Sequence, residues 1–241
     1  MKSAERTIAL LEYLSAAASP RTLRDVTRDM GIPRASAYAL LVTLVQTGWV
    51  ETDSSGSGFR PGIRALRAGA AYVEHDDVVQ RAQPVMNDLS GQLGETIHLA
   101  RLDGHEIVYL ATCLSRHSLA VVSKPGRRLP CWATGLGKAI LAGREWTEVD
   151  ALLPGALPAR TEHTITDRAA FRAELGEIAG RGHAIDNQES TLGLRCFAVA
   201  LEFADPPNEA LSCSIPTVRL DAAREEVIVE ALRSARERIL S

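Results

Sequence analysis

Residues 36–48, SAYALLVTLVQTG, decide how the N-terminal part of the chain is organised. Their apolar side chains recur at helical spacing, which predicts one helix with a core-facing side. Those side chains are Ala37, Leu40, Leu41 and Leu44. The remaining face gathers hydrogen-bond donors, namely Arg34, Ser36, Tyr38 and Thr43. Because such donors read base edges in the major groove, we expect a DNA-recognition helix.

The residues before this helix complete a helix-turn-helix pattern. Thr22 and Asp25 have the T-x-x-D spacing of a capping box, so a helix is expected to open at Thr22. Gly31 permits the positive φ of a helix C-cap, and Pro33 suits the first turn of the next helix. In such a motif the first helix crosses the phosphates, which makes Thr22 and Arg24 candidate DNA contacts.

Residues 49–60 predict a two-stranded β-wing. Short strand patterns at 49–52 and 59–60 flank the turn-rich run DSSGSG. The wing would place Ser57 and Arg60 beside the DNA backbone. A helix-turn-helix without a wing also occurs in protein-interaction domains. The wing favours DNA binding, and a helix-turn-helix that contacts only protein remains the alternative.

Length and composition are those of an ordinary globular protein. A chain of 241 residues, 46% apolar and 24% charged, can form a small domain and a larger one. No apolar run has membrane-spanning length, and the N-terminus lacks a secretory signal pattern, so we expect a cytoplasmic protein. The four cysteines form no C-x-x-C pair, which favours free thiols, and neither a cofactor nor a metal is expected.

Charge is distributed unevenly along the chain. Residues 1–75 hold nine Lys and Arg against seven Asp and Glu, whereas residues 76–241 hold eighteen against twenty-three. The overall net charge is -3. Only the first part therefore has the sign that suits a polyanion.

Residues 63–75, IRALRAGAAYVEH, predict a linker helix after the Pro61-Gly62 break. Its larger apolar residues follow a 3-4-3 spacing with small residues around them, which would let two copies approach closely. They are Ile63, Leu66, Ala70 and Val73. We therefore expect a homodimer, with a helix packed on its own domain as the alternative.

The remaining residues predict an α+β domain with an antiparallel sheet, because strands and helices do not alternate regularly. Expected helices cover 78–94, 134–141, 147–153 and 167–180, and a terminal helix has Ile228, Leu232, Ala235 and Ile239 on one face. Expected strands cover 95–100, 106–112, 119–123, 183–186, 195–203 and 210–216. Asp103-Gly104 is a hairpin signal between the first two.

Six ordered blocks resemble the IclR family of bacterial transcription regulators over nearly the full length. They are IPRASAYALLVTLVQTGWV, ETIHLARLDGHEIVYL, GRRLPCWATGLGKAIL, TEHTITD, GHAIDNQESTLGLRCFAVAL and LSCSIP. The resemblance implies a winged helix-turn-helix at 1–62, a linker helix at 63–75 and a GAF-like effector-binding domain at 76–241. It also implies double-stranded operator DNA, a small-molecule effector, and a dimer or dimer of dimers.

The resemblance also implies an effector site. Its residues in this chain are Leu119, Val121, Leu129, Gly135, Leu136, Asp186, Leu194, Cys196, Ser212 and Ser214. A helix start near Thr134 offers backbone N–H groups to a carboxylate, and Ser212 and Ser214 share a strand face. Since Asp186 would repel a bare anion, we expect a small carboxylic acid with a hydroxyl, a hydrated aldehyde or a similar donor beside the acid group.

Some positions depart from the family pattern. Ala35 and Ala39 remove polar groups from the recognition helix, and Trp132 and Leu136 alter the loop and helix beside the effector site. An enzyme with Cys196 as a thiol nucleophile, with His98 or His183 as its base, is a further alternative. Gly137-Lys138 is not a phosphate-binding loop, because Ala139 replaces the required Ser or Thr.

Overall fold

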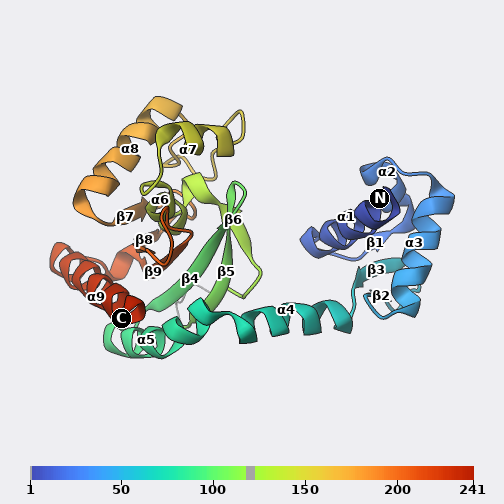
Figure 1. Ribbon diagram of the computed structural model, residues 1–241, viewed down its shortest axis with the longest axis horizontal. Coiled ribbons are helices and arrows are strands. Elements are labelled where there is room, and N and C mark those ends of the chain that lie inside the picture. The colour runs from blue at the N-terminus through green and yellow to red at the C-terminus, as the bar shows by residue number, and fades with distance from the viewer. Residues whose placement is uncertain (1, 118–122) are drawn as a thin grey trace. The chain divides into compact units, whose positions relative to one another are not determined.

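The computed structural model describes residues 2–117 and 123–241, and the chain forms two compact units, Met1–His75 and Asp76–Ser241 (Figure 1). Most of the strand predicted at 119–123, with Leu119 and Val121, lies outside the described residues.

The first unit contains three helices, a small sheet and a fourth helix that extends from it. The elements are α1 (Lys2–Ala16), β1 (Arg21–Thr22), α2 (Leu23–Met30), α3 (Arg34–Gln46), β2 (Val50–Thr52), β3 (Gly58–Pro61) and α4 (Ile63–His75). The predicted wing is present as β2 and β3, and β1 pairs with β3 to give an antiparallel sheet of order β1-β3-β2. The sequence did not predict β1, because two residues carry no strand periodicity.

The predicted helix-turn-helix is confirmed in its local chemistry. The Thr22 side chain accepts from Asp25 N, and the Asp25 carboxylate accepts from Thr22 N, so the capping box is complete. Gly31 ends α2 with a φ of 62°. Pro33 is the N-cap of α3 rather than part of its first turn, so the predicted position was wrong by one residue.

The core of the first unit lies between α1, α2 and α3. Its buried members are Leu10, Leu14, Val26, Ile32, Ala37, Leu41, Leu44 and Val50, and Leu40 packs against them. The apolar spacing in residues 3–17 predicts a first helix with Ile8, Leu11 and Leu14 on its buried face, but Ile8 is 59% exposed. Ile8 and Leu10 are two residues apart and lie on nearly opposite sides of a helix, so α1 buries only one of them.

Helix α4 is attached at its start and has no buried residue. Ile63 N donates to Glu51 Oε1 over 3.1 Å, and Arg64 N donates to the Gly48 carbonyl over 3.2 Å. A Cβ at Gly62 would lie 2.5 Å from that carbonyl, so the backbone approach requires glycine. The wing thus fixes the first turn of α4, while apolar side chains such as Leu66, 66% exposed, face away from the unit's core.

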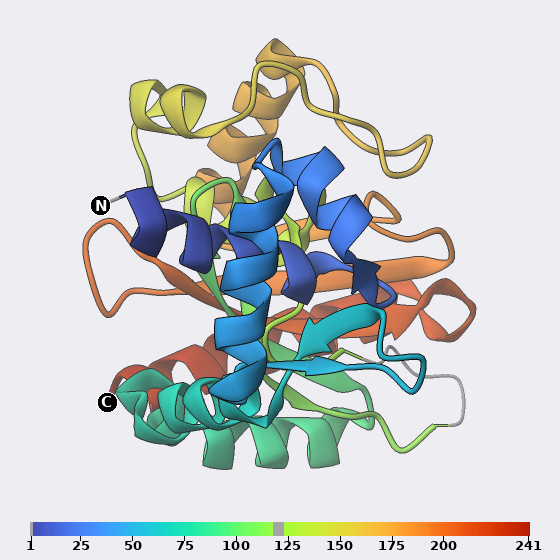
Figure 2. The ribbon, with the colours of Figure 1, turned by 90° about the vertical axis from the view of Figure 1, so that its right-hand side faces the viewer.

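The second unit is a six-stranded antiparallel sheet with helices on both faces (Figures 1 and 2). Its strands are β4 (Thr96–Asp103), β5 (Glu106–Cys113), β6 (Arg128–Pro130), β7 (Ala184–Asn187), β8 (Leu194–Leu201) and β9 (Glu209–Pro216), in the order β6-β5-β4-β9-β8-β7. Its helices are α5 (Asp77–Leu93), η1 (Cys131–Ala133), α6 (Gly135–Leu141), α7 (Trp146–Leu152), α8 (Arg168–Arg181), η2 (Thr217–Arg219) and α9 (Ala222–Leu240).

The predicted α+β class and the hairpin at Asp103-Gly104 are confirmed. Pro84 in the helix expected at 78–94 could kink the helix or delay its start, but α5 begins at Asp77, where the Asp76 side chain accepts from Val79 N. Strand β6 and η1 lie in the segment that the sequence suggested was a loop. In α9, the four residues predicted on one face are all buried.

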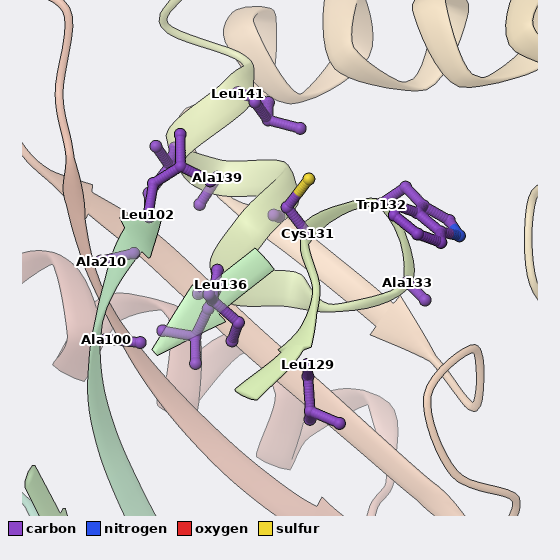
Figure 3. Close-up of a cluster of buried hydrophobic side chains, with 14 of the residues drawn as sticks. Ala100, Leu102, Leu129, Cys131, Trp132, Ala133, Leu136, Ala139, Leu141 and Ala210 are labelled. Carbon is purple, nitrogen blue, oxygen red and sulfur yellow. The ribbon is translucent and has the colours of Figure 1, made fainter. Parts of the chain in front are cut away.

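The two faces of the sheet differ in the size of their side chains. Alanines from four strands line the face under α6, and Leu136 and Ala139 of α6 point toward them (Figure 3). A Cβ at Gly137 would lie 2.2 Å from the Cys131 carbonyl oxygen, so α6 packs against η1 at backbone distance. Helices α5 and α9 lie side by side on the other face (Figure 2).

Candidate functional site

The predicted reading face of α3 is exposed. Arg34, Tyr38 (58% exposed) and Thr43 all reach solvent, and Ser36 is half-buried. The Thr43 hydroxyl donates to Ala39 O, whereas Arg34 and Tyr38 make no side-chain hydrogen bond to any residue that the structure describes. Two long donors are therefore available on one side of α3.

The remaining predicted DNA contacts surround α3. Arg24 is exposed on α2, and the Thr22 hydroxyl bonds to Asp25. At the wing, Ser57 Oγ lies 2.7 Å from Ser55 Oγ, and Arg60 pairs with Glu51 at 3.4 Å. Thr22 and Arg24 lie at the start of α2, and Ser57 and Arg60 lie on the wing, so all four belong to the unit whose core includes α3.

Three predicted effector residues meet in one row across the sheet. Asp186 on β7 pairs with Cys196 on β8, and Cys196 pairs with Ser214 on β9. Cys196 Sγ lies 3.0 Å from Ser214 Oγ. Because directly paired residues point to the same face, these side chains form a first polar row, on the α6 side of the sheet.

A second row lies one pleat further along the same face. It contains Ala198, Ser212, His98 and Thr112 in register on β8, β9, β4 and β5. Ser212 is therefore brought next to the first row. Leu194 starts β8 opposite Pro216, on the same face as Cys196 and at the end of the ladder.

Helix α6 supplies the remaining predicted residues next to β7 and β8. Thr134 is its N-cap and accepts from Gly137 N over 3.1 Å. A Cβ at Gly135 would lie 3.2 Å from the Cys196 carbonyl oxygen, so the helix start touches the strand that carries the first row. Leu129 pairs with Ile107 at the far edge strand β6, so the sheet register does not bring it to Asp186.

Asp186 is buried and already bonded to its own chain. Its carboxylate accepts from Glu189 N (2.7 Å), Ser190 N (3.2 Å) and Ser190 Oγ (2.6 Å). Burial nevertheless raises the pKa of Asp186. Its role in the structure is thus to hold the turn that follows β7, beside the start of α6.

A buried ion pair fixes the same turn to α6, and sequence reasoning missed it. Lys138, 1% exposed, lies 2.5 Å from Glu189 Oε1 and 3.2 Å from Glu174 Oε1. Glu189 Oε2 is buried and has no hydrogen-bond partner among the described residues. Periodicity cannot reveal such a pair, because Lys138 stands among apolar neighbours and its partners are 36 and 51 residues away.

The thiol-nucleophile alternative finds no support in the geometry. Burial, followed by the charge of Asp186, holds the pKa of Cys196 well above its ordinary value. The hydrogen-bonding neighbour of the thiol is Ser214, and His98 lies two strands away on β4. A thiol without a nearby base stays protonated at neutral pH.

The comparison with known families decides what these two units are. Residues 70–240 match the family described as bacterial transcriptional regulator IclR C-terminal, and residues 3–54 match the IclR helix-turn-helix domain. The chain belongs to the IclR family.

Individual relatives agree over nearly the whole chain. The regulator BhcR of Paracoccus denitrificans is 31% identical over 97% of this chain and 85% of its own length. A putative IclR regulator from Silicibacter is 30% identical with a TM-score of 0.86, covering 99% of this chain and 94% of that one. An IclR homologue from Microbacterium hydrocarbonoxydans, solved with 4-hydroxybenzoate, has the same fold, with 23% identity, a TM-score of 0.82, and coverage of 98% and 97%.

This IclR-family protein is therefore a transcription regulator with a helix-turn-helix domain for DNA and a C-terminal effector-binding domain. Its relatives are regulators rather than enzymes. Within residues 2–117 and 123–241, no helix is long and apolar enough to cross a membrane. The same residues contain no cluster of three or more His, Cys, Asp or Glu able to hold a metal.

Trp132, one of the departures from the IclR family pattern, is directed away from the polar rows. Its ring stacks on His105 at 6.2 Å, and its Nε1 donates to Pro158 O over 3.3 Å. The ring therefore fills space between the β4–β5 turn and the loop before α8.

A separate cavity of about 630 Å³ lies at the C-terminal end of α6, with Gly143, Gly182, Phe203 and Arg236 among its lining residues. None of the predicted effector residues lines it.

Proposed function

We propose that this IclR regulator binds operator DNA as a homodimer and that a small carboxylic acid, bound on the polar rows beside α6, controls that binding. The supporting observation is the convergence of Asp186, Cys196, Ser212 and Ser214 from three strands on the face that α6 covers. Polar side chains buried on an otherwise alanine-lined face suit a small polar ligand better than a packed core.

In this proposal the acid faces the start of α6 and the two serines. Gly135 and Leu136 line one side of the carboxylate, and Ser212 and Ser214 donate to it from the other. A hydroxyl or similar donor on the same molecule faces Asp186, because a buried carboxylate repels an anion that brings no donor. Leu194 and Cys196 complete the wall next to the ligand, with Leu119, Val121 and Leu129 as outer apolar contributors.

The Microbacterium homologue was solved with 4-hydroxybenzoate, a small carboxylic acid whose hydroxyl lies para to the acid group rather than beside it. It supports a carboxylic acid as effector but not the position of the donor. Asp186 still has lone pairs for such a donor, because each carboxylate offers about four acceptor sites and the chain uses three.

DNA recognition is assigned to the first unit. Arg34, Ser36, Tyr38 and Thr43 enter the major groove, while Thr22, Arg24, Ser57 and Arg60 contact the backbone. The segments act as a winged helix-turn-helix at 1–62, a linker helix at 63–75 and an effector-binding domain at 76–241. Pairing of α4 helices through Leu66 and its apolar neighbours would give the dimer, since no described residue of α4 is buried within the chain.

The signal would pass through α4, because its start is bonded to the first unit and the residue that follows it is ion-paired in the second unit. Glu51 and Gly48 fix its start to the wing. On the other side of the junction, Asp76 pairs with Arg101 of β4 at 2.6 Å, and Arg101 pairs with Glu209 at 2.6 Å. A ligand-induced change in the sheet that moves Arg101 would also move Asp76, which directly follows the last residue of α4. A small change in the spacing of the two recognition helices of the dimer would then alter operator affinity.

The test is fluorescence anisotropy with DNA from upstream of the protein's own operon, with and without glycolate, lactate and 4-hydroxybenzoate. Arg34→Ala should weaken binding by about 1–3 kcal/mol if Arg34 reads a base. Acetate, propionate and benzoate, which lack the hydroxyl, should act more weakly than their partners. Specific binding that no acid alters would refute effector control, and no specific binding at all would favour a protein-contacting helix-turn-helix.

A further inference from the structure

His98 carries a buried nitrogen with no partner on the same face as the proposed effector. His98 is 1% exposed and lies on β4, paired with Ser212 on one side and Thr112 on the other. Its Nδ1 lies 3.1 Å from Thr112 Oγ1, and its ring meets the edge of Tyr109 with centroids 4.9 Å apart. Its Nε2 is buried and has no hydrogen-bond partner among the described residues.

Such an atom needs an explanation, because nearly all buried polar atoms in native proteins are hydrogen-bonded. The ring lies on the α6 face, since it contacts Tyr109, a member of the cluster packed under α6. Nδ1 is occupied by Thr112, which leaves Nε2, the ring nitrogen farther from the backbone, to contact a ligand. Ser212 is the neighbour of His98 on the next strand.

We propose that His98 is an effector-contacting residue, whose Nε2–H donates a hydrogen bond to the carboxylate that Ser212 holds. This inference rests on the proposed function and adds a residue that selects for the acid group. The acid group would then be held by Ser212 on β9 and by His98 on β4, and His98 lies on the side of Ser212 away from Asp186. An ester or amide of the same molecule would lose the charge-assisted form of this bond.

The protonation state of His98 fits this role. Burial, together with the nearby charge of Arg127, lowers the pKa of His98 to about 3, so the ring is neutral at pH 7. A neutral ring has one donor and one acceptor. In the tautomer that the proposal requires, the Thr112 hydroxyl donates to Nδ1, and the single ring proton on Nε2 is available to the effector.

Two substitutions distinguish the roles of the two ring nitrogens of His98. His98→Asn places an amide near the Nδ1 position and removes the group at Nε2, whereas His98→Gln reaches the Nε2 position. Calorimetric titration with glycolate, lactate and 4-hydroxybenzoate should show affinity reduced roughly tenfold or more in H98N, and retained within about threefold in H98Q. His163→Asn, the same change at an exposed loop position, should bind as the wild type does.

The outcomes distinguish this inference from the function beneath it. If no probe acid binds the wild-type chain, the proposed function fails and the inference fails with it. If an acid binds the wild type and binds H98N equally well, only the role of His98 is overturned.

A measurement on the unaltered chain covers the case in which H98N does not fold. In ¹⁵N-histidine NMR spectra, saturating acid should shift the His98 Nε2 signal in the direction of a stronger donor. An unmoved His98 signal on binding would overturn the inference.

Discussion

The two units present their recognition groups in opposite ways. On α3, Arg34 and Tyr38 project into solvent with no side-chain hydrogen bond to a described residue. On the sheet, Asp186 and His98 are buried, and Asp186 is bonded three times to its own chain. A duplex can reach exposed side chains, whereas a small acid must be surrounded. Recognition and stability should therefore be separable in the first unit and coupled in the second.

The two units also differ in how far apart in sequence their hydrogen-bonded and ion-paired residues lie. In the first unit, the capping box of Thr22 and Asp25 spans three residues, and Asp53 closes the wing by accepting from Ser55 and Gly58. In the second unit, Arg219 pairs with Glu95 across 124 residues. Short-range bonds stabilise elements one at a time, and long-range bonds tie the whole sheet domain together.

The largest expected effect is at the buried ion pair. Lys138→Met leaves Glu189 buried without its counter-charge, which should lower the free energy of unfolding by about 3–5 kcal/mol. Urea unfolding followed by tryptophan fluorescence measures this change. Lys124→Met, the same substitution at an exposed position, should alter it by less than about 0.5 kcal/mol. Equal stability of the two variants would show that the buried ion pair does not stabilise the second unit.

The next effect depends on pH and on His98. Unfolded histidine titrates near pH 6.5, and folded His98 titrates at about 3, so between these values only the unfolded chain binds the proton. His98 therefore supports stability above about pH 6.5, and this support is lost as the pH falls. Relative to H98N, the wild type should lose about 2 kcal/mol of unfolding free energy from pH 7 to pH 5.

Urea titrations of wild type and H98N at several pH values provide that measurement. H163N, the same substitution at an exposed position, serves as the matched control. Parallel curves for wild type and H98N would show that folding does not lower the pKa of His98.

The sequence separation of the bonded residues also explains which features could be predicted from sequence. The capping box, the Gly31 helix end and the Asp103-Gly104 hairpin are local patterns, and the structure has all three. The linker helix at 63–75 also matches, because Pro61-Gly62 marks its start. Two local predictions were wrong by a small amount. Ile8 was expected to be buried on α1, whereas Leu10 is buried there, and Pro33 was placed in the first turn of α3, whereas it is the N-cap.

The candidate site could be predicted only in part. Alternation along a strand put Ser212 with Ser214, but it could not show that Asp186 and Cys196 join Ser214 in one row, because register between strands is not written in either strand alone. His98 was interpreted only as a possible base, since its meaning depends on Thr112 and Ser212 on two other strands. Lys138 was missed for the same reason.

A smaller effect is expected at the capping box of the first unit. Thr22→Ala removes the acceptor for Asp25 N and should destabilise α2 by about 1 kcal/mol. Hydrogen exchange of peptides from the first unit would report it, with Thr22→Ser as the control that keeps the hydroxyl. Because the bond is local, exchange in the second unit should not change. Faster exchange in β8 or β9 would contradict the separation of the two units.

The smallest effect on stability, at Tyr38, tests the comparison most directly. Tyr38 is 58% exposed on α3, so Tyr38→Ala removes little buried surface, and alanine is the better helix former. The free energy of unfolding should change by no more than about 0.5 kcal/mol, in the stabilising direction if at all. Operator binding should nevertheless weaken, because the phenol belongs to the reading face. The matched variant Tyr109→Ala, on the sheet, should destabilise by about 3–5 kcal/mol through loss of a buried aromatic ring. If Y38A lowers the free energy of unfolding as much as Y109A does, then Tyr38 stabilises the fold and does not belong to the DNA-reading face of α3.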